Sequence, residues 1–521
     1  MQLDLLVCRG HLVDGTGAAG RLADVGVVGD RIVAVGDLKG AQAAVRVEAA
    51  GLTVAPGFVD MHTHSDFTLL VDGRADSAVC QGVTTEVVGQ CGFSAAPMAP
   101  MADASQMLGH VAGTDVALDW RSFGDYLDRL DAARPAVNVA AFVGHGALWR
   151  VGGSDIPSLT TLAEQAFDEG AYGLSTGLEY WPGNESPAAE IDAMAAVAAR
   201  RGRLYATHVR NRDVDCEKGF AEALRSANVS GARLQISHIQ PKFGAPAGAM
   251  ERTLQMLDSA ARDGVDAAFD LIPHEWSHTV MIASLPAWAR EGGMEATLRR
   301  LKDPLQRQGM KQDPRPIWRL VTERQWHRIV LLRCMAHPEL VGVDFATIGR
   351  LRQCDPHDAM FDLLLEEGEQ MPQMMWTSRN FEDADICMCL RDARCSVMSD
   401  SLTVCNHGPL AGTIGSLGGY GWAARVLGEY SRDRGVLTLA EAVHRLSGRP
   451  AARLGLADRG VIKPGSFADL VVFDAAQVRD VATPMAPACH PPGFHHVWVN
   501  GQAVVRDGQR TQARPGRVLR A

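Results

Sequence analysis

The feature that most constrains the fold of this chain is a regular alternation of short apolar segments with helical segments. Five apolar segments begin at residues 137, 170, 203, 233 and 265, so that successive starts lie 30 to 33 residues apart. That spacing fits one strand and one helix per repeat, the unit from which parallel sheets are built. The middle of the chain is therefore predicted to be an α/β structure with a parallel sheet.

Eight apolar segments are found in all, and each is expected to form one strand. They begin at Phe58, Val83, Val137, Gly170, Arg203, Arg233, Val265 and Arg394. The helical segments between them include residues 158–169, 190–201, 216–227 and 250–262. Eight strands in this alternation predict a (β/α)8 TIM barrel, which carries its active site at the C-terminal ends of the strands.

The two ends of the chain differ from its middle, because they consist of short β-like runs separated by glycine. Residues 1–56 and 455–521 are predicted to form one small β-sandwich domain, and the barrel is expected over 57–454. The starts of the seventh and eighth strands lie 129 residues apart, which is too far for a simple loop. A small α/β insertion is therefore predicted at 285–375.

Composition narrows the possible partners and the compartment. A net charge of -10 and a pI near 5.9 disfavour nucleic acid or an anionic membrane as the main partner. The N-terminus has no basic leader, and no run of 18 uncharged apolar residues occurs, so a cytoplasmic protein acting on a small molecule is expected. The oligomeric state stays open, with a homo-oligomer among the alternatives.

Four histidines follow predicted strands. His62 and His64 end the segment that begins at Phe58, and side chains two residues apart on a strand share a face, as two ligands of one metal ion would. His208 and His238 follow the fifth and sixth strands. A surface pair and hydrogen-bonded core histidines are the alternative interpretations, but all four fall where barrel enzymes place their active sites.

Two further side chains stand at the same end of the predicted barrel. Asp400 follows the eighth strand; in isolation it would be interpreted as a turn or helix cap, but here it completes a ligand set. Cys91 follows the second strand, and a thiolate beside imidazoles is a good zinc ligand that can bridge two ions. The other ten of the eleven cysteines lack such a setting and are expected to be structural.

This set of residues on a barrel resembles the amidohydrolase superfamily of metal-dependent hydrolases. Within it, segments along nearly the whole chain are similar to N-acyl-D-amino-acid deacylases (D-aminoacylases). They include Ala55-Pro-Gly-Phe-Val-Asp-Met-His-Thr-His, Gly82-Val-Thr-Thr-Glu-Val-Val-Gly-Gln-Cys-Gly-Phe-Ser, Gly173-Leu-Ser-Thr-Gly-Leu, Thr207-His-Val-Arg-Asn and Lys463-Pro-Gly-Ser-Phe-Ala-Asp.

The resemblance implies a zinc-dependent hydrolase that cleaves a linear, non-peptide amide bond in N-acyl-D-amino acids or close analogues. It implies one tightly held zinc on Cys91, His208 and His238. It also implies a weaker second site, to which the cysteine can bridge, on His62, His64 and Asp400. Asp400 would act as general base toward water and then as general acid toward the leaving amine. Glu179 is an alternative ligand or a residue behind the ligands.

The resemblance breaks down where the substrate carboxylate is expected to bind. Family members acting on simple N-acyl-D-amino acids are expected to carry a lysine two positions after the sixth-strand histidine and an arginine in a His-Pro-Arg segment. This chain has Gln240 at the first place and the segment 401–410 without that motif at the second. Substrate contacts are predicted for Tyr180, Arg210, Gln240 and Ser277. Lys242 and Arg379 are further candidate cations, and His274 and His278 are less certain contacts.

Two other functions stay open. The same metal centre supports hydrolysis of a cyclic amide or of a D-residue-containing dipeptide or oligopeptide, and fold alone does not separate these reactions. The superfamily also includes non-catalytic scaffolds that have lost metal ligands. A scaffold is disfavoured because all six predicted ligands are present.

Overall fold

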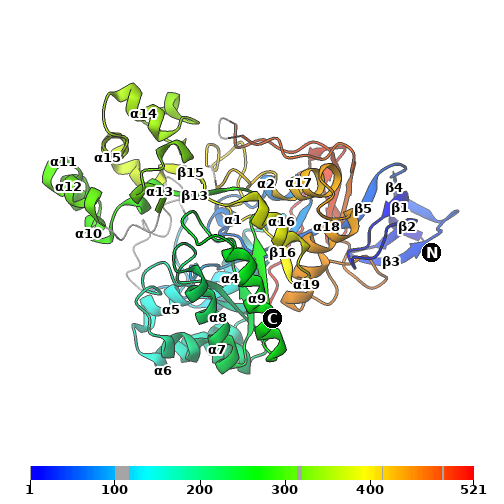
Figure 1. Ribbon diagram of the computed structural model, residues 1–521. Coiled ribbons are helices and arrows are strands. Elements are labelled where there is room, and N and C mark those ends of the chain that lie inside the picture. Colours follow the sequence, from blue (N-terminus) through cyan, green and yellow to red (C-terminus); the bar gives the residue numbers. More distant parts are fainter. Residues whose placement is uncertain (1, 100–115, 314–318, 414, 484–485) are drawn as a thin grey trace.

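A computed structural model of the chain describes residues 2–99, 116–313, 319–413, 415–483 and 486–521. Its centre is a sheet of eight parallel strands, which confirms the predicted barrel (Figure 1). In chain order they are β6 (Phe58–Asp60), β7 (Val83–Val88), β8 (Asn138–Gly144), β9 (Gly173–Gly177), β10 (Leu204–His208), β11 (Arg233–Ile236), β12 (Ala267–Leu271) and β16 (Cys395–Val397).

Hydrogen bonds just beyond the first and last strands bring the two edges of this sheet together. The amide of Asp400 donates to the carbonyl of His62 over 3.1 Å, and the amide of His64 donates to the carbonyl of Ser401 over 2.9 Å. The barrel therefore closes at the C-terminal ends of its strands, where the predicted ligands lie.

The helices that follow the strands agree with the sequence pattern within a few residues. They are α6 (Ile156–Asp168), α7 (Ala188–Arg200), α8 (Cys216–Ser230) and α9 (Ala249–Arg262). The side chain of Asp155 caps α6 by accepting a hydrogen bond from the amide of Ser158. Gly231, with φ of 71°, ends α8 in the left-handed conformation that glycine adopts readily.

The other helices are short or lie outside the barrel repeat. They are α1 (Thr68–Val71), α2 (Asp76–Val79), α4 (Phe123–Ala132), α5 (His145–Gly152), α16 (Asp383–Arg391), α17 (Trp422–Arg425), α18 (Leu439–Leu446) and α19 (Gly448–Leu454), and a π-helical turn spans Val426–Asp433. None of the described helices is long and apolar enough to cross a membrane. All eleven cysteines are free.

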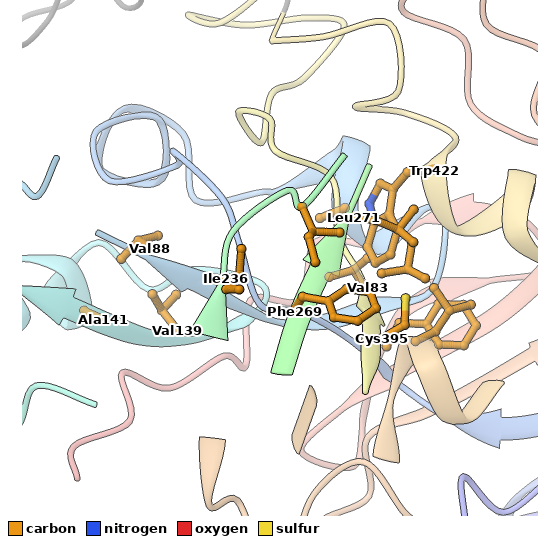
Figure 2. Close-up of a cluster of buried hydrophobic side chains, with 14 of the residues drawn as sticks. Val83, Val88, Val139, Ala141, Ile236, Phe269, Leu271, Cys395 and Trp422 are labelled. Carbon is orange, nitrogen blue, oxygen red and sulfur yellow. The ribbon is translucent and has the colours of Figure 1, made fainter. Parts of the chain in front are cut away.

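Apolar side chains of the barrel strands form the main core. Figure 2 shows Val139 and Ala141 on β8, Phe269 and Leu271 on β12, and Trp422 of α17 within this core. Alternate residues of a strand share a face, so one face of each strand packs in this layer while the other faces the barrel interior. The helices are held against the outside of the barrel by burial of this layer.

A second sheet of nine strands joins the two ends of the chain, and strand β17 pairs with β5 to connect them. Its strands are β1 (Gln2–Leu12), β2 (Arg21–Val28), β3 (Arg31–Gly36), β4 (Gln42–Glu48), β5 (Thr53–Pro56), β17 (Leu470–Phe473), β18 (Phe494–Val499), β19 (Gln502–Arg506) and β20 (Gln509–Arg510). The proposed domain limits at 56 and 455 stay a prediction, because strand pairing does not set domain boundaries.

A third sheet, of three antiparallel strands in the order β13 (Trp276–Val280), β15 (Met375–Arg379) and β14 (Ile329–Arg333), lies between the seventh and eighth barrel strands. Its helices gather at one side of the molecule (Figure 1): α10 (Ala287–Arg290), α11 (Gly293–Lys302), α12 (Pro304–Gln312), α13 (Arg319–Thr322), α14 (Phe345–Arg352) and α15 (Pro356–Glu367). This part has an apolar cluster of its own. The predicted limits 285–375 miss β13 and nearly all of β15, and residues 314–318 lie outside the described chain.

Candidate metal centre

The structure brings the six predicted ligands together at the C-terminal ends of the barrel strands. Cys91 lies at the centre, because its Sγ is 3.3 Å from Nε2 of His62, 3.6 Å from Nδ1 of His208 and 3.3 Å from Nε2 of His238. Asp400 completes the set, with Oδ1 at 3.2 Å from Nε2 of His64 and 3.5 Å from Nε2 of His62.

Three overlapping groups of these residues have donor atoms within 4.8 Å of one another. They are His62–His64–Cys91, Cys91–His208–His238 and His62–His238–Asp400. Cys91 is shared by two groups and Asp400 belongs to the third, so the donors cover adjacent positions rather than one point. His64 and Asp400 are the most exposed members, with 28% and 18% of their side chains accessible.

The backbone at three of these residues is strained. Cys91, His238 and Asp400 have φ values of 53°, 34° and 46°, in the left-handed region that non-glycine residues rarely occupy. Such conformations cost of order 1–3 kcal/mol each and persist where the surroundings impose them, most often at functional sites. The barrel therefore holds these three side chains in positions that a relaxed chain would not choose.

Charged residues behind His208 fix the orientation of its ring. Glu179 accepts from Nε2 of His208 over 2.8 Å, which leaves Nδ1 of the ring free to face Cys91. The ammonium group of Lys242 donates to the same carboxylate over 2.6 Å. Burial raises the pKa of Glu179, but Lys242 and His208 outweigh it and hold that pKa well below its ordinary value. The carboxylate is ionised and occupied, which places Glu179 behind the ligand rather than among the donors.

Burial also sets the protonation of the donors. Burial lowers the pKa of His208 to about 4 despite the hydrogen bond with Glu179, so this imidazole is neutral at pH 7. Burial raises the pKa of the Cys91 thiol well above its ordinary value. Burial opposes ionisation of Asp400 too, but the hydrogen bond from His64 and the imidazoles of His62 and His238 keep its pKa well below the ordinary value.

Comparison with known families agrees with this geometry. Residues 46–505 match the sequence model described as Amidohydrolase family.

The chain belongs to the amidohydrolase family.

This amidohydrolase is 34% identical over 528 residues to an N-acyl-D-glutamate deacylase of Alcaligenes xylosoxydans xylosoxydans, covering 100% of the chain and 97% of the relative. It is also 34% identical to a D-aminoacylase of the same organism, over 99% of the chain and 97% of that relative. The chain is also similar to a solved structure of N-acyl-D-glutamate deacylase from Bordetella bronchiseptica, with a TM-score of 0.81, 31% identity and full coverage of both chains. That structure holds zinc and a phosphonate inhibitor that mimics the tetrahedral intermediate.

The predicted substrate contacts of the amidohydrolase do not all gather at the centre as its predicted ligands do. Tyr180 lies beside the centre, with its ring 4.8 Å from that of His208. Both ends of the buried amide of Gln240 bond to the backbone of Ile272, at 2.5 and 3.1 Å, and join the loops after β11 and β12. Ser277 lies in β13, 3.0 Å from the hydroxyl of Ser378.

The predicted cations are also occupied. Arg210 donates to the carboxylate of Glu222 and to three backbone carbonyls of the segment 183–186, so it holds a loop together. Arg379 pairs with Glu275 and has 55% of its side chain exposed. Arg210 and Gln240 as substrate contacts are therefore not supported by their surroundings, because each has its polar atoms engaged by the protein.

The sequence reasoning overlooked two residues beside the centre. Asp270, the fourth residue of β12, accepts from the amide of His238 over 2.6 Å and lies 3.7 Å from Nδ1 of His62. Arg212, four residues after His208, donates to the carbonyl of His238 over 2.7 Å. Both act on the loop that carries His238. Position at the end of a strand could have indicated Asp270, whereas Arg212 comes from an irregular loop that no periodicity describes.

Proposed function

We propose that this chain is a zinc-dependent hydrolase that removes the acyl group of N-acyl-D-amino acids. The observation that carries the proposal is the cluster of one thiol, four imidazoles and one carboxylate within contact distance at the C-terminal ends of the barrel strands. The full-length similarity to deacylases of N-acyl-D-amino acids supports the substrate class.

The donor set fits zinc. Zinc prefers sulfur and imidazole nitrogen, and three protein ligands with an open position are typical of its catalytic sites. Nδ1 of both His62 and His238 is buried without a hydrogen-bond partner among the described residues, so each ring faces the cluster through Nε2. Cys91, His208 and His238 would hold the tight ion. His62, His64 and Asp400 would hold a weaker second one.

The reaction needs an activated water and a proton carrier. Zinc held by these residues would lower the pKa of a bound water and polarise the scissile carbonyl. Asp400 is ionised at neutral pH and projects into the cluster, so its carboxylate accepts the proton of the attacking water. The same oxygen then delivers that proton to the nitrogen of the leaving amine. His64, at 3.2 Å, orients the carboxylate.

The experiment that tests the proposal is a hydrolysis screen that pairs N-acetyl-D-amino acids with their L enantiomers and includes cyclic amides and D-residue-containing dipeptides. Cleavage of the D series at least tenfold faster than the L series supports the proposal. Equal rates on both enantiomers, or cleavage of cyclic amides or dipeptides alone, would refute it in favour of the corresponding alternative. No hydrolysis by zinc-loaded protein would favour a scaffold.

A further inference from the structure

The cations expected to hold a substrate carboxylate are engaged elsewhere. Arg210 is bound to Glu222, Lys242 to Glu179 and Arg379 to Glu275. An N-acyl amino acid carries its carboxylate one carbon away from the scissile amide nitrogen. Its binding partner must therefore lie close to the ligand histidines rather than at the rim of the barrel.

Arg212 is a cation in that position. Its side chain follows β10 in a short irregular segment, and the residue is only 4% exposed. Nη1 donates to the carbonyl of His238 over 2.7 Å, and the guanidinium carbon lies 5.8 Å from the ring centroid of Phe381. The guanidinium thus lies against the loop that presents His238, beside the centre.

The charge of Arg212 is not balanced by a protein carboxylate. In the described part of the chain no carboxylate lies within 4.0 Å of the guanidinium, and its Nε is buried without a hydrogen-bond partner. Burying an ionised group without a counter-charge is expensive, so a protein that retains one usually pairs it with a ligand. The carboxylate of Glu179, behind His208, is itself paired with Lys242.

The predicted substrate tyrosine, Tyr180, lies beside the same ligand histidines. The ring of Tyr180 packs on His208 at 4.8 Å and on Phe93 at 5.3 Å. Tyr180 therefore contacts the ligand His208, and Arg212 is hydrogen-bonded to the backbone of the ligand His238.

We propose that Arg212 binds the free α-carboxylate of the substrate, in place of the cations that this chain lacks. The proposal rests on the proposed function and sharpens it: the substrate is an N-acylated D-amino acid with an ionised carboxylate, not its amide or ester. Guanidinium and carboxylate form strong charge-assisted hydrogen bonds, and the buried Nε of Arg212 has no hydrogen-bond partner among the described residues.

The test compares an N-acetyl-D-amino acid with its neutral C-terminal amide, using the D-amino acid that the wild type cleaves best. The variant Arg212→Gln is expected to raise KM for the acid roughly 10- to 100-fold, because a hydrogen bond to a charged group contributes about 1.5–3 kcal/mol. Because Arg212 also bonds to the loop of His238, the readout is the ratio of kcat/KM for the acid to kcat/KM for the amide, which should fall at least about tenfold. Arg212→Lys should restore part of the affinity for the acid.

The matched control is Arg299→Gln, which removes an exposed arginine of α11 and should change neither substrate. Zinc content and thermal unfolding are measured on every variant. Equal loss on acid and amide, loss of zinc, or no change with the acid would overturn the role of Arg212 while leaving the proposed function in place. If the wild type cleaves neither acid nor amide, the proposed function itself fails, and the role of Arg212 fails with it.

If Arg212→Gln does not fold, the conservative variant decides. Arg212→Lys keeps the charge but loses the fork of donors, so KM for the acid should rise several-fold while the amide is unaffected. An Arg212→Lys enzyme with unchanged KM for both substrates would refute the proposal.

Discussion

At the scale of single residues, three residues of the cluster have a left-handed backbone conformation. Cys91, His238 and Asp400 would each be more relaxed as glycine, yet each carries a donor atom of the site. Strain of this kind is retained where it positions a functional group. It also explains why sequence reasoning found the residues through their place after a strand but could not give their conformation.

Cys91→Ala is the first test at this scale. The thiol contacts three of the four imidazoles, so its removal should leave the purified protein with well under one zinc per chain, roughly half or less of the wild-type content. Metal analysis by mass spectrometry measures it. Cys354→Ala is the matched control, because that free cysteine belongs to none of the donor groups. A fully zinc-loaded Cys91→Ala protein would contradict the assignment of Cys91.

Asp400→Asn separates proton transfer from metal binding. An amide keeps the shape of the carboxylate but cannot carry the proton, so kcat should fall about 10²- to 10⁴-fold while the tight zinc stays bound. Steady-state rates on an N-acetyl-D-amino acid, alongside zinc content, give the answer. Asp507→Asn, at an exposed position, serves as control. Near-normal turnover in the variant would exclude Asp400 as the proton carrier.

Glu86 predicts a dependence of stability on pH. Burial raises its pKa from 4.5 to about 7, so the folded state binds this proton more tightly than the unfolded state does. The contribution of Glu86 to stability is therefore complete below pH 4.5 and is lost as the pH rises through about 7. Glutamine cannot ionise, so Glu86→Gln should gain roughly 2–3 kcal/mol in free energy of unfolding over the wild type at pH 8.

Denaturant unfolding of both proteins at pH 5 and pH 8 tests this expectation. The advantage of the variant should be small at pH 5 and larger at pH 8. Glu295→Gln, at an exposed helix position, should show no such trend. An advantage that does not change with pH would mean that Glu86 is not protonated in the folded protein near neutrality.

At the scale of elements, all eight barrel strands could be predicted from the sequence, because each is a short apolar run between helical segments. Their starts were less accurate. The fourth strand begins at Gly173 rather than Gly170, since Gly170 has φ of 113° and still belongs to the turn after α6. The three-stranded sheet was not predicted, because β13 and β15 pair over about a hundred residues of intervening chain and no local signal marks that pairing.

The C-terminal segment is an element whose packing can be tested. The amide of Leu519 donates to Val139 on β8 over 2.7 Å, and a Cβ placed on Gly516 would lie 1.9 Å from the carbonyl oxygen of Val137. Gly516→Ala should therefore displace this segment and lower the free energy of unfolding by about 1–3 kcal/mol.

The matched control is Gly309→Ala, in the exposed part of α12. There the nearest atom to a new Cβ is 3.7 Å away, so the change should stabilise by roughly 0.5–1 kcal/mol. Thermal or denaturant unfolding of both variants distinguishes them. A neutral Gly516→Ala would show that the C-terminal segment is not held against the barrel.

At the scale of the whole molecule, the barrel brings residues from positions 62 to 400 together at one end, as the sequence pattern predicted. The residues around the substrate could not be predicted in the same way. The sequence predicted Gln240 and Arg210 as substrate contacts, but they are hydrogen-bonded to Ile272 and Glu222. Such partners depend on how the loops fold, which no local pattern in the sequence gives. Arg212 was overlooked for the same reason.

The most direct test of the central claim couples zinc content to turnover in one titration. The purified protein is stripped with a chelator and reloaded stepwise with zinc, while hydrolysis of an N-acetyl-D-amino acid and bound zinc are both followed. Activity should vanish with the metal and return with the first equivalent of zinc, because Cys91, His208 and His238 form a compact donor group. Turnover that persists in metal-free, folded protein would contradict the account.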